Sequence, residues 1–184
     1  MNKIKILVPV YNDWQSVFKL LKNINSEISK LGGEFSVIIV NDGSTESRPE
    51  FLADLSSLKS IQVINMKKNK GHARCNAAGL KYINEKEKFD YVIPMDGDGE
   101  DRPEELSLLI EKTKEYPDIV VTANRVKRSE GYIFKLCYLV HKYLTLVFTG
   151  QTIKYGNYTC LPKSAVNTMA VSYTHLTLPT TPYV

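Results

Sequence analysis

The chain alternates between short apolar runs and longer segments in which apolar residues recur every three or four positions. The apolar runs predict five strands, at Ile4–Val10, Phe35–Val40, Ile61–Asn65, 91–96 (YVIPMD) and 119–123 (IVVTA). The run Phe35–Val40 is continuous, which is typical of a strand buried on both faces of a parallel sheet.

Helical spacing of apolar residues separates these runs. The predicted helices are Trp14–Leu31, Pro49–Leu58, one that begins near Gly71 and one that begins at Arg102-Pro103. Asn12 or Asp13 can cap the first of them, and Gly32-Gly33 can end it. Proline is favoured in a first helical turn, which fits Pro103. This alternation predicts an α/β fold with a doubly wound, mostly parallel sheet.

Polar side chains follow three of the predicted strands at the point where each ends. They are Tyr11-Asn12-Asp13 after the first strand, Asn41–Ser44 after the second, and the acidic stretch MDGDGED (95–101) after the fourth. Ligands of doubly wound sheets bind outside the carboxyl ends of the strands. We therefore expect one binding site at that edge.

Several kinds of nucleotide and metal site are excluded. The chain has no GxGxxG after its first strand and no GxxxxGK[ST], which argues against a dinucleotide-binding domain and a P-loop. An EF-hand loop that started at Asp96 would need Gly and Glu where Asp101 and Ser107 stand. Phosphatases with an aspartyl nucleophile carry their D-x-D on the first strand, whereas here it follows the fourth.

The acidic stretch itself suggests a cation. Asp96, Asp98 and Glu100 stand at alternate positions, so in an extended segment their carboxylates point the same way and can converge on Mg²⁺ or Mn²⁺. Gly97 and Gly99 would let a ligand approach the backbone. Asp101 is expected to cap the helix at Pro103. The alternative is a solvated acidic turn.

Four segments, in order, resemble the family 2 glycosyltransferases with the GT-A fold. They are VPVYND, IIVNDGST, NKGHARCNAAGL and YVIPMDGDGEDRPEEL. Within that family the chain is most similar to the polyprenyl-phosphate sugar transferases, the dolichol-phosphate mannose synthase type. The resemblance is close from Lys3 to Arg128 and looser from Gly131 to Pro162. It implies a GT-A fold and transfer from a nucleotide sugar.

The resemblance also implies roles for individual residues. Pro9, Tyr11 and Asp13 would line the nucleotide base, Asp42 would reach the base or ribose, and Gly71 and Arg74 would lie by the donor. Asp96 would lie near the sugar and diphosphate, and Asp98 with Glu100 would hold the metal. Each residue also has a local reading, such as strand-end packing for Pro9 and Tyr11 or a helix cap for Asp13. His72 departs from the commoner small or polar residue and is expected to form hydrogen bonds rather than bind metal.

The distribution of acidic residues along the chain bears on the nature of the acceptor. No Asp or Glu follows Glu130. A hydroxyl acceptor needs a carboxylate base, so either the base lies beyond this sequence or the acceptor is already an anion, such as polyprenyl phosphate. The resemblance places phosphate-contacting arginines at Arg125 and Arg128, and the arginine fork suits phosphate. The alternative for these residues is a solvated basic loop.

Residues 131–150 are apolar and aromatic but are interrupted by Lys135, His141 and Lys142. Charges at such positions disfavour a membrane span, which requires about 20 apolar residues. The segment predicts an amphipathic helix on a membrane surface, or a helix packed on the catalytic domain. The first reading would place the protein at the cytoplasmic, inner face of the cell membrane.

The last residues differ from the rest of the chain. After Lys163 there is no Lys, Arg, Asp or Glu, and codons for Val171–Leu176 can spell a transposon end used in sequencing libraries. We therefore expect a GT-A domain at 1–170 with an incomplete C-terminal part, followed by a non-native tail at 171–184. The alternative is a genuine Thr/Pro-rich tail.

Composition adds little to this reading. The length of 184 residues with 43% hydrophobic residues fits one domain, and the net charge of +4 permits a phosphate-bearing partner without indicating nucleic acid. The three cysteines are far apart in sequence, which suggests neither a zinc site nor a disulfide framework.

The favoured function is a metal-dependent, inverting transfer of a hexose from a UDP- or GDP-sugar to an acceptor, with polyprenyl phosphate as one such acceptor. Three alternatives stay open. The first is transfer to a saccharide hydroxyl in cell-envelope polysaccharide synthesis. The second is a nucleotidyltransferase, although VPVYND lacks the Gly-rich, basic loop such enzymes need. The third is a non-catalytic nucleotide-sugar-binding remnant.

Overall fold

A mixed six-stranded sheet organises the part of the chain that the computed structural model describes, namely residues 2–50, 54–123, 140, 143 and 158–175. The strands are β1 (Lys3–Val10), β2 (Glu34–Asn41), β3 (Ser60–Asn65), β4 (Tyr91–Pro94), β5 (Val121–Thr122) and β6 (Thr159–Pro162). Their order across the sheet is β3-β2-β1-β4-β6-β5. The pairs β1–β2, β2–β3 and β1–β4 are parallel, whereas β6 runs antiparallel to both β4 and β5. The predicted mostly parallel α/β sheet is confirmed.

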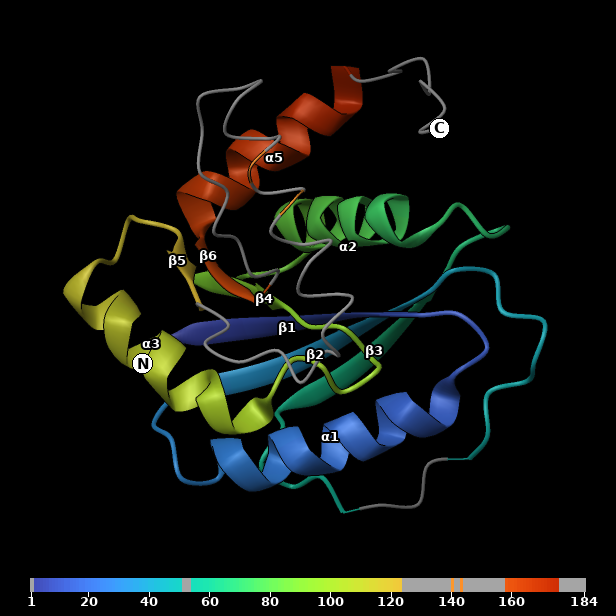
Figure 1. Ribbon diagram of the computed structural model, residues 1–184, viewed down its shortest axis with the longest axis horizontal. Coiled ribbons are helices and arrows are strands. Elements are labelled where there is room, and N and C mark those ends of the chain that lie inside the picture. Colours follow the sequence, from blue (N-terminus) through green and yellow to red (C-terminus); the bar gives the residue numbers. More distant parts are fainter. Residues whose placement is uncertain (1, 51–53, 124–139, 141–142, 144–157, 176–184) are drawn as a thin grey trace.

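Helices cover both faces of this sheet (Figure 1). The helical segments are α1 (Trp14–Ile28), α2 (His72–Lys86), the 3₁₀ turn η1 (Pro103–Glu105), α3 (Leu106–Glu115) and α5 (Lys163–His175). Helices α1 and α3 lie on one face and α2 and α5 on the other. The layers therefore follow the doubly wound arrangement.

The alternation of side chains along each strand fills both layers. Ile4, Ile6 and Val8 of β1 belong to the core beneath α1 and α3, whereas Leu7 belongs to the core beneath α2. Because both faces are covered, β1 is apolar at every position from Ile6 to Val10. Gly79 lets α2 pack closely on the sheet: a Cβ there would clash with Leu7 and lie 2.9 Å from Val40 Cγ2.

The helix predicted at Pro49–Leu58 is wrong for the described part of that segment, since Pro49, Glu50 and residues 54–58 are not helical. The Asp54 carboxylate accepts a hydrogen bond from Ser56 N at 3.0 Å, which stabilises a local turn in competition with a helix. Ser57 N donates to Asn25 Oδ1 of α1 at 3.0 Å. Because the Ser57 amide bonds to a side chain of α1, it does not form the backbone hydrogen bond that a helix would require.

The edge containing β5 and β6 also differs from the prediction. The apolar run 119–123 contributes only Val121–Thr122 to the sheet, and Ile119 and Val120 are exposed. β6 and α5 were not predicted. Thr159–Pro162 is short, and its neighbours carry no clear period, so pairing with β4 rather than local pattern makes it a strand.

Two sequence predictions fall on the C-terminal part of the chain. The segment 131–150 lies outside the described residues except for Val140 and Tyr143, which are both exposed. Across the described ranges, no helix combines the length and the apolar character needed to cross a bilayer. Helix α5 continues through Ala170, where the non-native tail is expected to begin.

A buried ion pair connects β1 to the end of α2. Lys5 Nζ lies 2.7 Å from Glu87 Oε2, and the two side chains are 7% and 16% exposed. Gln62 Nε2 donates to Glu87 Oε1 at 2.9 Å, and Tyr82 OH donates to Gln62 Oε1 at 3.1 Å. The hydrogen bond from Lys5 lowers the pKa of Glu87 below its ordinary value.

We expect Glu87→Ala to lower the free energy of unfolding by about 3 kcal/mol, because it leaves the Lys5 ammonium buried without its partner. The wild-type pair stabilises the fold above the ordinary carboxyl pKa of 4.5, and this contribution is lost as the pH falls through the lowered folded-state pKa. Urea unfolding at several pH values measures both effects. The matched control is Glu85→Ala, which removes the exposed 3.8 Å pair with Lys81 and should cost at most about 0.5 kcal/mol.

Candidate active site

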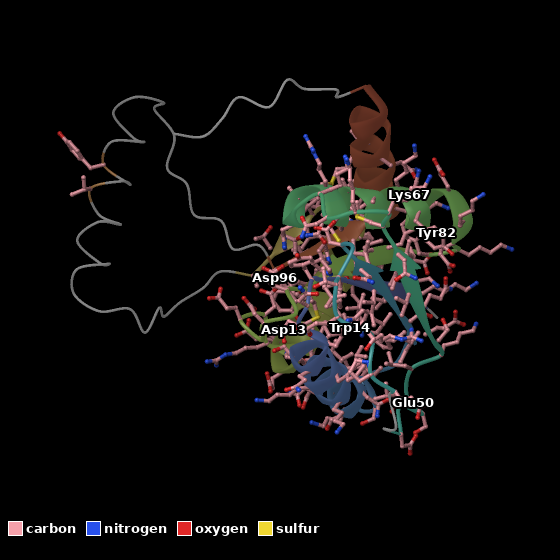
Figure 2. All side chains as sticks on the ribbon, turned by 90° about the vertical axis from the view of Figure 1, so that its right-hand side faces the viewer. Asp13, Trp14, Glu50, Lys67, Tyr82 and Asp96 are labelled. Atoms are coloured by element: carbon pink, nitrogen blue, oxygen red, sulfur yellow. The ribbon has the colours of Figure 1, made fainter. Side chains whose placement is uncertain are left out.

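A cleft of about 340 Å³ opens where β1, β2 and β4 end. Four carboxylates line it, those of Asp13, Asp42, Asp96 and Asp98. Figure 2 turns the right-hand side of Figure 1 toward the viewer, and Asp13 and Asp96 are labelled there between α1 and α2. The structure therefore brings the three predicted strand-end segments together at one edge of the sheet.

The end of β1 is joined to the end of β2 by Asn12. Its backbone adopts a φ of 53°, an uncommon left-handed conformation that Asn tolerates. Asn12 Oδ1 accepts from Thr45 N at 2.8 Å and from Glu46 N at 3.2 Å, and Asn12 N donates to Ser44 Oγ at 3.0 Å. These bonds hold the two loops beside the cleft in a fixed relation.

Asp13 is the N-cap of α1, as its local reading predicted. Its Oδ1 accepts a hydrogen bond from Ser16 N at 3.2 Å. The position also lines the cleft, so capping and a contact with a bound nucleotide are compatible. A carboxylate at a helix N-terminus is stabilised by the helix dipole, which offsets part of the repulsion from the other acids.

Asp42 is 3% exposed and holds the start of α2. Its Oδ1 accepts from Lys70 N and its Oδ2 from Gly71 N, both at 2.8 Å. The neighbouring Gly43 has a φ of 69°, and a Cβ there would lie 2.7 Å from Asn69 N. The β2 loop and the loop before α2 are therefore in direct backbone contact, which requires glycine.

The acidic stretch after β4 forms a closed loop. Asp101 Oδ2 accepts from Asp96 N at 2.9 Å, and Asp98 Oδ1 accepts from Glu100 N at 2.9 Å. The prediction that Asp101 caps the next helix is wrong. Arg102 is the N-cap residue of η1 and its side chain forms no capping hydrogen bond, and Asp101 closes the loop onto Asp96.

Gly97 packs closely on α1 and β1 and also lines the cleft, so the predicted approach of a ligand to its backbone stays a prediction. A Cβ at this position would lie 3.1 Å from Val17 Cγ2 and 3.4 Å from Pro9 O. The space above Gly97 is thus filled by α1 and β1. Gly99 has open space around it but a φ of 85°, so its turn conformation favours glycine.

A divalent cation fits this cleft only if water and phosphate oxygens provide most of its ligands. Asp98 is exposed and lines the cleft, and it has no ion-pair partner among the described residues. No cluster of three or more His, Cys, Asp or Glu side chains suited to a metal occurs in the described ranges. Mg²⁺ sites with one or two carboxylates that are completed by phosphates and water match this donor set.

The predicted site residues divide into three groups. The structure places Pro9, Tyr11, Asp13, Asp42, Gly71, Asp96 and Asp98 around the cleft. Arg74 and Glu100 are exposed nearby and are not among its lining residues. Arg125 and Arg128 lie outside the described residues. The roles of all these residues stay predictions.

Sequence reasoning did not place Asn69, His72 and Cys75 in the cleft. Cys75 is fully buried, and its Sγ donates to Val40 O at 3.3 Å. Burial and the nearby Asp42 charge raise the pKa of this thiol to about 12, so it is a neutral wall residue and not a nucleophile. Cys75 faces the sheet from α2, and helical spacing could have shown this.

His72 contacts a cleft carboxylate. It is the first residue of α2, and its Nε2 lies 3.4 Å from Asp96 Oδ1 and 2.8 Å from Asn76 Nδ2. It forms hydrogen bonds, as the sequence predicted.

Residues 5–167 match the family model described as glycosyl transferase family 2. The chain belongs to this family. Ligands of doubly wound sheets bind outside the carboxyl ends of the strands, which is where the carboxylate-lined cleft lies. The predicted resemblance is confirmed at the level of the family.

One solved structure supports the fold, and a second is similar without adding to that support. Mannosyl-3-phosphoglycerate synthase from Rubrobacter xylanophilus matches with a TM-score of 0.62 at 14% identity, over 88% of this chain and 53% of its own. S. aureus TarS, also solved with UDP and with UDP-GlcNAc, matches with a TM-score of 0.48 at 20% identity in its 1–349 form, over 70% of this chain and 38% of its own. The chain thus spans about half, or less, of the structures that it matches.

Proposed function

We propose that this family 2 glycosyltransferase moves a hexose, with inversion, from a UDP- or GDP-sugar to polyprenyl phosphate at the cytoplasmic face of a membrane. Mg²⁺ or Mn²⁺ is part of the proposal. The domain assignment, 1–170 for the enzyme and 171–184 for a non-native tail, is proposed with it.

One observation carries the proposal, namely the environment of Asp98. The buried carboxylate of Asp42 accepts hydrogen bonds from two backbone amides, and that of Asp13 accepts one in the first turn of α1. Asp98 lies exposed at the cleft, with a hydrogen bond from the amide of Glu100 in its own loop. An exposed carboxylate beside three others is favourable when a cation binds between it and an anionic ligand.

The donor would lie along the cleft from β1 to β4. Tyr11, whose side chain is 47% exposed, provides an aromatic face for the base beside Pro9. Asp96 would hold the sugar half, and Asp98 with Glu100 would hold the cation. When bound, the cation neutralises charge on the departing diphosphate. The amides of Lys70 and Gly71 are engaged by Asp42, so the start of α2 is fixed before the donor binds.

The phosphate acceptor is supported by charge. A phosphate oxygen is ionised at neutral pH and needs no base to remove a proton, and Arg125 and Arg128 follow the last predicted parallel strand. The competing proposal is transfer to a saccharide hydroxyl. That acceptor would need a carboxylate base to remove its proton. Family membership favours glycosyl transfer over the nucleotidyl transfer that the sequence left open.

Calorimetric titration with UDP-glucose, UDP-GlcNAc and GDP-mannose in Mn²⁺, followed by an assay of transfer to polyprenyl phosphate, tests the proposal. We expect one donor to bind and to be consumed only when the lipid phosphate is present. Binding without transfer to any acceptor would identify a non-catalytic nucleotide-sugar-binding protein. Transfer to a saccharide and not to the lipid would overturn polyprenyl phosphate as the acceptor and support the saccharide hydroxyl.

Removal of the cation gives a separate prediction. We expect EDTA to weaken donor binding by at least about 30-fold, because the carboxylates then face the diphosphate unscreened. Added Mn²⁺ or Mg²⁺ should restore it, as measured by the same titration. Unchanged affinity in EDTA would show that the site works without metal.

A further inference from the structure

His72 lies on the α2 side of the cleft, opposite the loop that carries Asp96. Its side chain is 57% exposed, so packing alone does not fix the ring. Two polar contacts at Nε2 do so, one with Asp96 Oδ1 at 3.4 Å and one with Asn76 Nδ2 at 2.8 Å. The imidazole therefore links α2 to the end of β4 across the cleft.

Asn76 stands one turn after His72 on the same face of α2. An amide side chain can present either its nitrogen or its oxygen to the ring, and both orientations meet Nε2. In the recorded orientation Nδ2 faces the ring, and Asn76 Oδ1 is buried without a hydrogen-bond partner among the described residues. Turning the amide over directs the oxygen to the ring, and Nε2 then carries a proton that Asp96 Oδ1 can also accept. Asn76 thus restrains the ring at the distance from Asp96 that the structure shows.

Asp96 is fixed from two directions. Its backbone amide is bound by Asp101 Oδ2 at 2.9 Å, and its carboxylate faces His72. A side chain that is oriented before a ligand arrives loses less conformational freedom on binding. With its proton on Nε2, His72 also offsets repulsion between Asp96 and the other cleft acids.

We propose that His72 is a positioning residue, which orients the Asp96 carboxylate toward the sugar half of the donor. The inference rests on the proposed function, since it assumes a nucleotide sugar in the cleft. It predicts that His72 contributes to the binding of the sugar half of the donor and not to the binding of the nucleoside diphosphate.

A double-mutant cycle in Mn²⁺ tests the inference. The affinities of wild type, His72→Ala, Asp96→Ala and the double variant are measured by calorimetry for UDP-glucose, UDP-GlcNAc and GDP-mannose, and for UDP and GDP alone. We expect His72→Ala to lower the affinity for the nucleotide sugar that binds by about 10-fold. The affinity for the corresponding nucleoside diphosphate should fall by less than about twofold. In the Asp96→Ala background, His72→Ala should have no further effect, because its partner is gone.

Two further variants separate positioning from a structural role. Gln in place of His72 can donate an amide hydrogen to Asp96, so His72→Gln should recover most of the lost affinity. Lys81→Ala removes an exposed basic side chain from the same helix and should change neither affinity. Thermal unfolding should be unchanged in all these variants except for small effects at Asp96.

The outcomes distinguish this inference from the proposed function. If the wild type binds none of the nucleotide sugars, both are overturned. Two results with a wild type that binds a nucleotide sugar would overturn the positioning role alone. The first is that the affinity losses of the two single variants add up in the double variant. The second is that His72→Ala lowers the affinities for the nucleoside diphosphate and for the nucleotide sugar equally.

Discussion

Asp98→Ala should reduce sugar transfer on the order of 1,000-fold or more, while the fold stays intact. Asp98 is an exposed carboxylate of the cleft, and among the described residues it forms no ion pair. Its hydrogen bond to Glu100 N lies within one turn, so its removal costs little stability. The proposed cation would lose a ligand at the point where charge develops on the leaving diphosphate.

Steady-state transfer and thermal unfolding measure the two halves of this expectation. Glu111→Ala is the matched control, because it removes an exposed carboxylate from α3, outside the cleft. That variant should transfer sugar at the wild-type rate. Activity of Asp98→Ala within a few-fold of the wild type would contradict the assignment of the metal site.

Asp42→Ala should weaken both the fold and donor binding. It leaves the amide of Lys70 without its acceptor and that of Gly71 with only Asn69 Oδ1 at 3.0 Å, and the residue that it changes is 3% exposed. Two charge-assisted hydrogen bonds from part-buried amides correspond to a loss of about 3 kcal/mol. At about 2–4 °C per kcal/mol for a protein of this size, the melting temperature should fall by roughly 6–12 °C.

Donor affinity should fall with it by at least about 100-fold, because Gly71 and His72 at the start of α2 then lose their fixed place at the cleft. Asp54→Ala is the matched control. Asp54 also accepts a backbone amide, from Ser56 at 3.0 Å, but in an exposed loop, so about 0.5 kcal/mol is expected. A melting temperature of Asp42→Ala equal to that of the control would contradict the role of Asp42.

The parallel half of the fold was predictable because its strands are buried on both faces. A strand such as Phe35–Val40 is apolar at every position except Ser36, and that pattern is visible without any partner. β6 gives no such signal, since its strand identity depends on pairing with β4. The failed helix at Pro49–Leu58 shows the converse, because a local turn at Asp54 and a tether to Asn25 outweigh an apolar period.

The candidate site divides in the same way. Asp96, Asp98 and Asp42 could be placed because parallel strands bring their carboxyl ends to one edge of a sheet. The partner of each side chain could not be predicted from sequence. That Asp101 closes its own loop, and that His72 meets Asp96, depends on backbone turns and the entry of α2.

The antiparallel pair β5–β6 has a consequence for the geometry of the sheet edge. Ala123 N donates to Tyr158 O at 2.9 Å, directly beside the ladder pairs Thr122–Thr159 and Val121–Cys160. Two positions that are far apart in the sequence are thus held next to each other by backbone bonds. The described residues that line the cleft come instead from β1, α1, α2 and the loops that follow β1, β2 and β4 or precede α2. Within the described part of the chain, joining these distant positions and lining the cleft are therefore tasks of different strands.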